Sequence, residues 1–410
     1  MLDFAQMCPK VSTVKLPASA PFVPTHDAAA LVGSEVGGEI GGERAGTMPR
    51  FLADGLTTAI AQHLDQLDQR VCAIDHHAGA LVAQCRALLA GGKRHRAALA
   101  YWSYAAHTTG DHPLAAESQQ AVFHLGAALE LFQASALFHD DLLDNSDLRR
   151  GQPTAHRAFA TQHQHHGYLG DAAKFGANAA ILLGDLTLAL AYDALNTAIV
   201  GARLSDNHAM LARQYFSEIC QEVIAGQYLD MLLENEPLTA KLNNQRAYHV
   251  ISAKSASYSA RYPLVLGAVF AGASAARLDQ LSDIGEKIGT AFQLRDDVLG
   301  IFGNPAKTGK PSGDDLREGK RTVLLLETLR KIPAVDRDRL ATLIGNPNLT
   351  SAELAWAQGL ITNCGARAAI ETEILTLATA ATSQLAGLPL AEPGKSRLLE
   401  LARALTVSNL

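Results

Sequence analysis

The sequence predicts an all-α fold, and three observations lead to that prediction. Hydrophobic residues make up 48% of the 410 residues but aromatic residues only 6%, and the many Ala and Leu residues favour helices over strands. From Phe51 onward, apolar residues recur three and four positions apart in long segments. Clusters of Gly, Pro, Asn or Asp separate these segments every few turns. We therefore expect one large helical domain at 51–410.

The same periodicity gives the order of the helices along the chain. They are expected at 52–67, 70–90, 95–108, 117–145, 172–200, 207–233, 245–272, 277–303, 321–331, 335–344, 351–358, 362–386 and 394–406. The stretches AVFHLGAALELFQASALFHD and ANAAILLGDLTLALAYDAL, in the fourth and fifth of these, have little polar face. Helices that are hydrophobic nearly all round are expected at the centre of a large bundle.

Residues 1–50 have a different composition, with three prolines between 17 and 24 and the glycine-rich stretch GSEVGGEIGGERAG at 33–46. We expect a flexible Pro/Gly-rich tail. The N-terminus has no basic segment followed by an apolar core, so no signal peptide is expected. The most apolar windows, 262–276 and 179–191, are shorter than a membrane span or interrupted by Asp185. No transmembrane segment is therefore expected.

Charge and cysteine content exclude several classes of protein. The net charge is −6, which argues against a protein that neutralises the backbone of a nucleic acid. The cysteines are odd in number, scattered and without a CxxC pair, so neither a disulfide framework nor a zinc site is expected. They are Cys8, Cys72, Cys85, Cys220 and Cys364. A reducing cytoplasm fits this pattern best.

The first cluster of chemical interest is acidic and follows an apolar helix. Asp140, Asp141 and Asp144 lie in FHDDLLDNSDLRRGQPTAH, and in a helix Asp140 and Asp144 share a face. Two carboxylates at this spacing repel each other, and the C-terminus of a helix is the negative end of its dipole. Such an arrangement indicates a cation site.

A second acidic pair, Asp296 and Asp297 in IGTAFQLRDDVLGIFG, also follows a long apolar helical stretch. One such pair alone is usually solvated surface. Two pairs at the ends of apolar helices predict instead a shared site, in which Mg²⁺ bridges carboxylates and the oxygens of a diphosphate.

Short basic stretches accompany the acids. They are GGKRHR (Lys93, Arg94, Arg96), LRRG (Arg149, Arg150), AKSASY (Lys254) and TGKPSGDDLREGKRT (Lys310, Lys320, Arg321). Any one of these residues alone would be read as an ordinary exposed cation. Together, each beside Gly or a helix end, they predict recognition of two separate diphosphates, one through magnesium and one directly.

With these motifs in order, the chain resembles the trans-isoprenyl diphosphate synthase (polyprenyl synthetase) family over about Gly91 to Thr322. The resemblance rests on GGKRHR, ELFQASALFHDDLLDNSDLRRGQPTAH, ILLGD, GQYLD, AKSASY, FQLRDDVLG and GKPSGDDLREGKRT. It implies an isoprenoid synthase-type bundle of about ten to thirteen helices around a central apolar cavity. It also implies a homodimer.

The resemblance implies the site residue by residue. Asp140, Asp144 and Asp296 would hold on the order of two or three Mg²⁺ ions, with Mn²⁺ able to substitute, and Asp141 and Asp297 would support them. Contacts to the allylic diphosphate are expected from Arg149, Lys254, Lys310 and Lys320. The diphosphate of isopentenyl diphosphate would be held by Lys93, Arg96, Gln133 and Arg150. Phe292 and Gln293 match a pair beside the reaction centre, and Arg94 and Ser255 complete the substrate-binding candidates.

The reaction that the resemblance implies condenses isopentenyl diphosphate with dimethylallyl, geranyl or farnesyl diphosphate. Magnesium and the lysines would neutralise the leaving diphosphate, the allylic C–O bond would ionise, and the C=C bond of isopentenyl diphosphate would attack the cation. Two positions depart from the family pattern: Gly300 stands where many members have a third Asp, and Gln133 stands where many bacterial members have His.

Product length is expected to depend on the depth of the apolar pocket below the first acidic cluster. Ser135 and Ala136, five and four positions before Asp140, are small, where farnesyl-producing relatives often carry aromatic residues. Phe132, a further turn away, is a candidate floor, although core packing explains one buried Phe equally well. We expect geranylgeranyl diphosphate, with farnesyl or longer products as alternatives.

Two other functions remain to be weighed. A class I terpene cyclase shares the acidic logic, but its Asn/Ser/Glu metal motif is not found in this sequence. A non-catalytic partner subunit would have no need for mutually repelling carboxylates.

Histidines at 156, 163, 165 and 166, and the pair at 76 and 77, are expected in polar loops or on helix faces, because we expect no Cys or carboxylate to complete a metal-ligand set with them. Asp315, in a Gly-rich loop, matches a family acid that orients lysines, and a solvated loop is the alternative.

Overall fold

The computed structural model describes residues 48–108, 116–238, 244–304 and 312–407. These residues belong to one unit of the chain, Arg44–Leu410. The expected tail at 1–50, apart from its last three residues, lies outside the described part, and so does Lys310.

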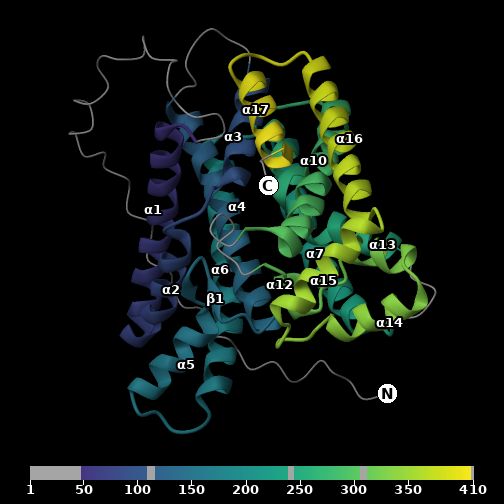
Figure 1. The fold of residues 1–410 in the computed structure, drawn as a ribbon. Helices are drawn as coiled ribbons and strands as arrows, with labels where there is room; N and C mark the ends of the chain where they lie inside the picture. Colours follow the sequence, from purple (N-terminus) through teal and green to yellow (C-terminus); the bar gives the residue numbers. More distant parts are fainter. Residues whose placement is uncertain (1–47, 109–115, 239–243, 305–311, 408–410) are drawn as a thin grey trace, which may run out of the picture. The chain divides into compact units, whose positions relative to one another are not determined.

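The all-α prediction is confirmed (Figure 1). The helices are α1 (Arg50–Ile74), η2 (His76–Ala78), α2 (Gly79–Leu89), α3 (His95–His107), α4 (Ala116–Leu143), α5 (Ala155–His165), α6 (Ala172–Gly201), α7 (Asp206–Asn235), α8 (Asn244–Val250), η3 (Ile251–Arg261), α9 (Tyr262–Phe270), α10 (Ala275–Phe302), α12 (Asp314–Glu318), α13 (Val323–Lys331), α14 (Ala334–Leu343), α15 (Ser351–Asn363), α16 (Ala366–Gly387) and α17 (Gly394–Val407). Two short strands, β1 (Leu148–Arg149) and β2 (Gln152–Pro153), pair in antiparallel fashion.

The structure corrects several expected boundaries. The break expected at 68–69 is wrong, because α1 runs on to Ile74 and ends at Asp75, whose backbone is extended. No Gly or Pro stands between 68 and 70 to end the helix. The hairpin of β1 and β2, together with α5 and α12, was not expected, because these short segments show too few turns of apolar periodicity.

The segment expected as one helix at 245–272 is divided into three. Its middle part, η3, is a π-helix of 11 residues that carries Lys254. A Cβ added at Gly226 of α7 would lie 2.5 Å from Lys254 N, and one added at Gly289 of α10 would lie 2.5 Å from Ala256 Cα. The backbone of η3 therefore packs directly against α7 on one side and α10 on the other. Long π-helical stretches are rare and often lie at functional sites.

The buried apolar residues form two cores. The larger core contains residues of α1, α3, α4, α6 and α9, and it includes Phe138 near the end of α4. The smaller core contains residues of α13, α15 and α16. Helix α10 takes part in both, since Ile288 belongs to the larger core and Ala291 and later residues belong to the smaller one. The last turns of α4 and α10 thus belong to different cores.

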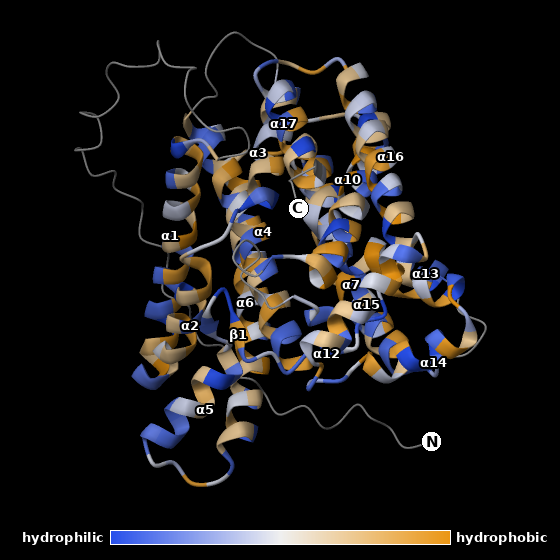
Figure 2. Ribbon diagram, in the orientation of Figure 1, coloured by the Kyte–Doolittle hydropathy of each residue, from blue (hydrophilic) through white to orange (hydrophobic). Residues whose placement is uncertain are grey.

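Two of the described helices, α4 and α6, are long and apolar enough to cross a membrane by length and composition alone. The most apolar 18-residue window is 78% buried in α4 and 39% buried in α6, and core helices of other proteins pass the same test. In Figure 2, polar residues (blue) and apolar residues (orange) alternate along α1, as in an amphipathic helix on the outside of a bundle. The low burial of α6 means that one face of this apolar helix is uncovered in a single chain.

Candidate active site

A cavity of about 580 Å³ contains members of both acidic clusters. Asp140 of α4 and Asp296 of α10 both line it, as do Lys254 of η3 and Lys320, which follows α12. Helices α6 and α7 contribute further walls, with Asp185 and Asp230 among the lining residues. The two helix ends that the sequence singled out therefore meet at one space.

The first acidic cluster is held by Arg149 of β1. The Arg149 guanidinium donates from Nε to Asp141 Oδ1 at 2.8 Å and lies 3.8 Å from Asp140 Oδ2. Burial acts to raise the pKa of Asp140, but the charges of Lys254, Lys320 and Arg149 outweigh it and lower the pKa. Burial, with the charge of Asp140, raises the pKa of Asp144. One carboxylate of the pair is thus kept ionised while the other resists ionisation, as expected for like charges on one helix face.

Two half-buried lysines neutralise these acids. Lys254 Nζ lies 2.6 Å from Asp230 Oδ2 and 3.2 Å from Asp140 Oδ1. Lys320 Nζ lies 2.7 Å from Glu318 Oε2 and 3.4 Å from Asp144 Oδ2. Burial acts to lower the pKa of both lysines, but the neighbouring carboxylates raise it, so both remain charged.

The second acidic cluster divides into an inner and an outer member. Asp297 is buried and accepts a hydrogen bond from Gln293 Nε2 at 2.8 Å. Burial, with the charge of Asp315, raises the pKa of Asp297 well above its usual value. Asp296, the residue before it, lines the cavity, as do Asp297 and Gln293. Because Asp297 is the buried member, is hydrogen-bonded to Gln293 and has a raised pKa, the geometry suits Asp296 as the ligand and Asp297 as its support.

The donor set fits a divalent cation. Mg²⁺ prefers hard oxygen ligands and keeps several waters or phosphate oxygens in its shell. Asp140 Oδ1 is buried and lies 3.2 Å from the Lys254 ammonium, so it is already paired with a cation in the protein alone. The carboxylates of Asp140 and Asp296 at one cavity are oxygen donors of the kind that Mg²⁺ prefers.

A second basic cluster surrounds the turn before α3. Arg150 Nη1 donates to the backbone carbonyls of Leu88 and Gly91, at 3.0 and 2.6 Å. Arg94 donates to Leu89 O at 3.0 Å and to Thr57 Oγ1 at 2.6 Å. Both guanidinium groups therefore order the turn that carries the exposed Lys93.

Arg96 connects this turn to the cavity. It is buried, donates to Ser259 Oγ at 3.0 Å, and its guanidinium lies 4.3 Å from the centre of the Tyr258 ring, which lines the cavity. Beneath these cations, burial raises the pKa of Glu130, against the charges of Arg96, Arg94 and Arg150.

Three other predicted residues lie in or near the lining of the cavity. Gln133 is half-buried on α4. The Phe292 ring centre lies 5.4 Å from that of His95, the residue before Arg96. Ser255 lines the cavity beside Lys254.

The far wall of the cavity is apolar. Phe132, Ser135 and Ala136 all line it, with Leu188 of α6 and Val223 of α7. Ser135 Oγ donates to Gly184 O at 2.8 Å, so its polar atom is turned into the contact between α4 and α6. The Phe132 ring packs edge-on against Phe216 and Tyr258, with centres 6.1 and 6.0 Å apart.

The sequence predictions missed several acids that the structure brings to the site. Asp230 and Glu234 of α7 and Glu318 of α12 lie close to the two lysines. The motif GQYLD contains Asp230 and was the available signal. Glu234 had no such signal, because it reaches the site only through the packing of α7 against η3.

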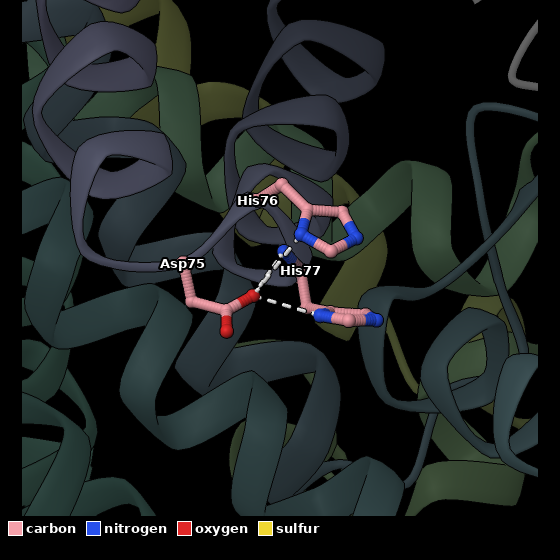
Figure 3. A group of neighbouring side chains, drawn as sticks. All are labelled: Asp75, His76 and His77. Carbon is pink, nitrogen blue, oxygen red and sulfur yellow. Dashed lines mark hydrogen bonds and ion pairs between the residues drawn. The ribbon is translucent and has the colours of Figure 1, made fainter.

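The histidines that the sequence analysis considered as metal ligands lie outside the cavity lining. His156 and His163 are buried around α5, where the His163 ring contacts Phe175 at 5.1 Å between centres. His76 and His77 do have a neighbouring carboxylate, contrary to expectation: Asp75 Oδ1 lies 3.5 Å from His76 Nδ1 and 2.7 Å from His77 Nδ1 (Figure 3). The same oxygen accepts a hydrogen bond from His77 N at 2.9 Å and caps η2. All three side chains are exposed, and none lines the cavity.

Comparisons with known proteins agree with this geometry. The sequence profile of the family described as "Polyprenyl synthetase" matches residues 80–361. A short chain isoprenyl diphosphate synthase from Methanocaldococcus jannaschii is 33% identical over 273 residues, which are 66% of this chain and 72% of that protein. A nonaprenyl diphosphate synthase from Mycobacterium tuberculosis is 30% identical over 76% of this chain and 82% of its own length.

This chain is also similar to a solved structure over most of the length of both proteins. The crystal structure of a geranylgeranyl pyrophosphate synthase from Corynebacterium glutamicum, complexed with isoprenyl diphosphate and magnesium, has a TM-score of 0.79 and 35% sequence identity. The alignment covers 87% of this chain and 98% of that one.

Stabilisation by magnesium is expected to depend on pH. Burial, with the charges of Asp230 and Asp144, raises the pKa of Glu234 to about 7. The raised value means that Glu234 favours the folded state below its unfolded pKa and loses this contribution as the pH rises through about 7. Glu234 is close enough to Asp144, one of the expected ligands, for their charges to interact, so its ionisation adds negative charge that favours a bound cation. The increase in melting temperature on adding Mg²⁺ should therefore grow between about pH 5 and about pH 7.5.

Glu234→Gln should move the midpoint of that pH dependence to lower pH, whereas the exposed Glu117→Gln on α4 should not move it. A magnesium effect of equal size at every pH, or an unchanged midpoint in Glu234→Gln, would contradict this assignment.

Proposed function

The chain belongs to the polyprenyl synthetase family, and we propose that it is a trans-prenyltransferase whose main product is geranylgeranyl diphosphate. The observation that carries the proposal is that Asp140 and Asp296, on different helices, line one cavity whose opposite wall is apolar. An acidic, lysine-bearing mouth suits a metal-bound diphosphate, and an apolar interior suits a growing hydrocarbon chain.

Proteins of this family use a divalent metal. Asp140, Asp144 and Asp296 would hold Mg²⁺ in this chain, and the metal, when bound, would neutralise the diphosphate of the allylic substrate. Lys254, Lys320 and Arg149 would then exchange their carboxylate partners in part for diphosphate oxygens. Because these cations are already charged and held in place, they need little reorganisation when negative charge develops on the leaving diphosphate.

The second basic cluster would bind the diphosphate of isopentenyl diphosphate. Lys93 and Arg96 are the candidates for direct contact, and Arg94 and Arg150 hold the turn that presents them. Gln133 keeps an amide donor on the same side of α4. Two separately placed diphosphates would leave the allylic carbon and the C=C bond of isopentenyl diphosphate side by side.

The chemistry then needs no nucleophilic side chain. The allylic C–O bond breaks with its electron pair on diphosphate, the C=C electrons of isopentenyl diphosphate form the new C–C bond, and a proton leaves to the released diphosphate. Tyr258 and the apolar wall, which line the cavity, exclude water from the cation. Phe292 packs nearby against His95. Gln293 is tied to Asp297 and fixes the end of α10 beside the reacting atoms.

A direct assay tests this function. Purified protein incubated with isopentenyl diphosphate, a farnesyl diphosphate primer and Mg²⁺ should give a linear C20 diphosphate. Asp296→Asn should lower the rate by about 10²-fold or more, since it removes an electrostatic group that acts on the leaving diphosphate. Asp279→Asn, an exposed position on the same helix, is the matched control and should keep the wild-type rate. A cyclic hydrocarbon product would indicate a terpene cyclase, and no turnover would indicate a non-catalytic subunit.

Product length is the part of the proposal that the relatives leave open, since their names include both geranylgeranyl and nonaprenyl synthases. The C20 assignment is supported by small side chains at Ser135 and Ala136 and by the aromatic group of Phe132 and Tyr258 deeper in the cavity.

In the same assay, Ala136→Phe should shorten the main product, because the added ring would fill the cavity below the first acidic cluster. Phe132→Leu should give the opposite change and allow longer products. Product analysis by chromatography of the dephosphorylated alcohols measures both. An unchanged product profile in Ala136→Phe would show that another wall sets the length.

We also propose that two copies associate through α6. Leu182 and Val200 on this helix are 61% and 73% exposed, and apolar faces of this kind are usually covered by a partner. A second copy is the partner favoured here, because closed symmetric dimers are the commonest assemblies.

The absence of disulfides among the described cysteines is consistent with a cytoplasmic protein.

Light scattering should give a mass about twice 43.5 kDa. Leu182→Glu should shift the protein towards a monomer, whereas Leu375→Glu, at an exposed position on α16, should not. A monomeric wild-type protein at micromolar concentration would contradict the proposal.

A further inference from the structure

The carboxylate of Asp315 occupies the place of a side chain that the second acidic cluster lacks. Gly300 lies four residues after Asp296, at the position where many members of the family have a third Asp. A Cβ added at Gly300 would lie 2.0 Å from Asp315 Oδ2 and 2.3 Å from Asp315 Cγ. No pair of non-bonded atoms tolerates this distance. Residue 300 therefore cannot carry even a methyl group while Asp315 keeps its position.

The backbone that leads into Asp315 is anchored to the end of α10. Gly313 N donates to Gly300 O at 3.0 Å, and Ser312 Oγ donates to Ile301 O at 3.0 Å. Gly313 has a positive φ of 78° and begins α12, so the chain turns sharply against the last turn of α10. The contact between Asp315 and the open side of Gly300 thus belongs to an anchored turn.

Asp315 also acts electrically on both sides of the site. Burial is the largest cause of the raised pKa of Asp297 on α10, and the charge of Asp315 is the next largest. For Lys320, burial lowers the pKa, whereas the charges of Asp144 and then Asp315 contribute most to raising it. The backbone N of Lys320 donates to the backbone carbonyl of Asp315 at 3.0 Å, which holds the two residues close together. The Asp315 carboxylate is therefore near both Gly300 at the end of α10 and the lysine that reaches the first acidic cluster.

We propose that Asp315 supplies the third carboxylate of the second acidic cluster from α12, in place of a side chain at residue 300, and supports the metal held at Asp296. The inference rests on the proposed function, since it assumes that Asp296 binds a divalent metal. Asp315 is a positioning residue in this account, because it acts through the groups around Asp296. The glycine at 300 is then required by the aspartate at 315, and the two positions can be exchanged only together.

A simpler role for Asp315 would be to hold Lys320 alone. That role requires the carboxylate to remain on α12, near the ammonium group of Lys320. The proposed role requires only that a carboxylate occupy the space between α10 and α12, whichever backbone carries it. Moving the carboxylate from residue 315 to residue 300 separates the two roles.

The experiment compares four variants with the wild type: Asp315→Asn, Asp315→Ala, Gly300→Asp/Asp315→Ala and Gly300→Ala/Asp315→Ala. The two double variants relieve the same steric conflict and differ only in whether residue 300 carries a carboxylate. Mg²⁺ affinity is measured by calorimetric titration in the presence of inorganic pyrophosphate, and the melting temperature without ligands shows whether each variant folds. Asp315→Asn keeps the size of the side chain, so it remains informative if the alanine variants unfold.

Asp315→Asn and Asp315→Ala should each weaken Mg²⁺ binding by about 10- to 100-fold, the usual effect of losing a group that supports a metal ligand. Gly300→Asp/Asp315→Ala should recover most of that affinity, and Gly300→Ala/Asp315→Ala should not. Equal affinities in the two double variants, or wild-type affinity in Asp315→Asn, would overturn the proposal. Absence of pyrophosphate-dependent Mg²⁺ binding in the wild type would instead contradict the proposed function itself.

Discussion

The repulsion between carboxylates gathered at the ends of α4 and α10 is the constraint on which the rest of the site depends. Asp144 directly follows α4 and its N donates to Asp140 O at 2.8 Å, while Asp140 and Asp296, from two different helices, line the same cavity. Such a concentration of negative charge in a partly buried space is tolerated only if cations compensate it. Lys254, Lys320 and Arg149 do so in the protein alone, with ion-pair distances from 2.6 to 3.8 Å. The same cations are then correctly placed for an anionic substrate.

The fold brings these charges together by joining two hydrophobic cores. Helix α4 ends in the larger core and α10 ends in the smaller one, and the cavity lies where they meet. Helix η3 connects the two, because its backbone is in direct contact with both α7 and α10 at Gly226 and Gly289. The ammonium of Lys254 is therefore placed by the packing of the bundle rather than by a loop, which suits a group that must meet a substrate at a fixed position.

The sequence was sufficient for the fold class and for the residues whose chemistry is visible in short motifs. Periodicity predicted most of the long helices, and the acidic clusters stood out because carboxylates at i and i+4 are unfavourable without a cation. It was insufficient where a residue acts through tertiary packing. The π-helix η3 packs against glycines of two other helices, and the pKa of Glu234, raised to about 7, follows from its burial and from the charges of Asp230 and Asp144. The direct contact between Gly300 and Asp315 likewise exists only because α12 folds back on α10.

The tight packing of η3 has a consequence for how this scaffold can diversify. A wall whose backbone is pressed against its neighbours on both sides has no slack, so a larger or smaller side chain there would displace the Lys254 ammonium as well. The opposite wall, on α4 and α6, includes the small residues Ser135 and Ala136 beside Phe132, and substitution of these uncharged side chains can change its depth. Evolution of new product lengths in such a protein should therefore be concentrated on one side of the tunnel, while the side that carries the lysine stays constant.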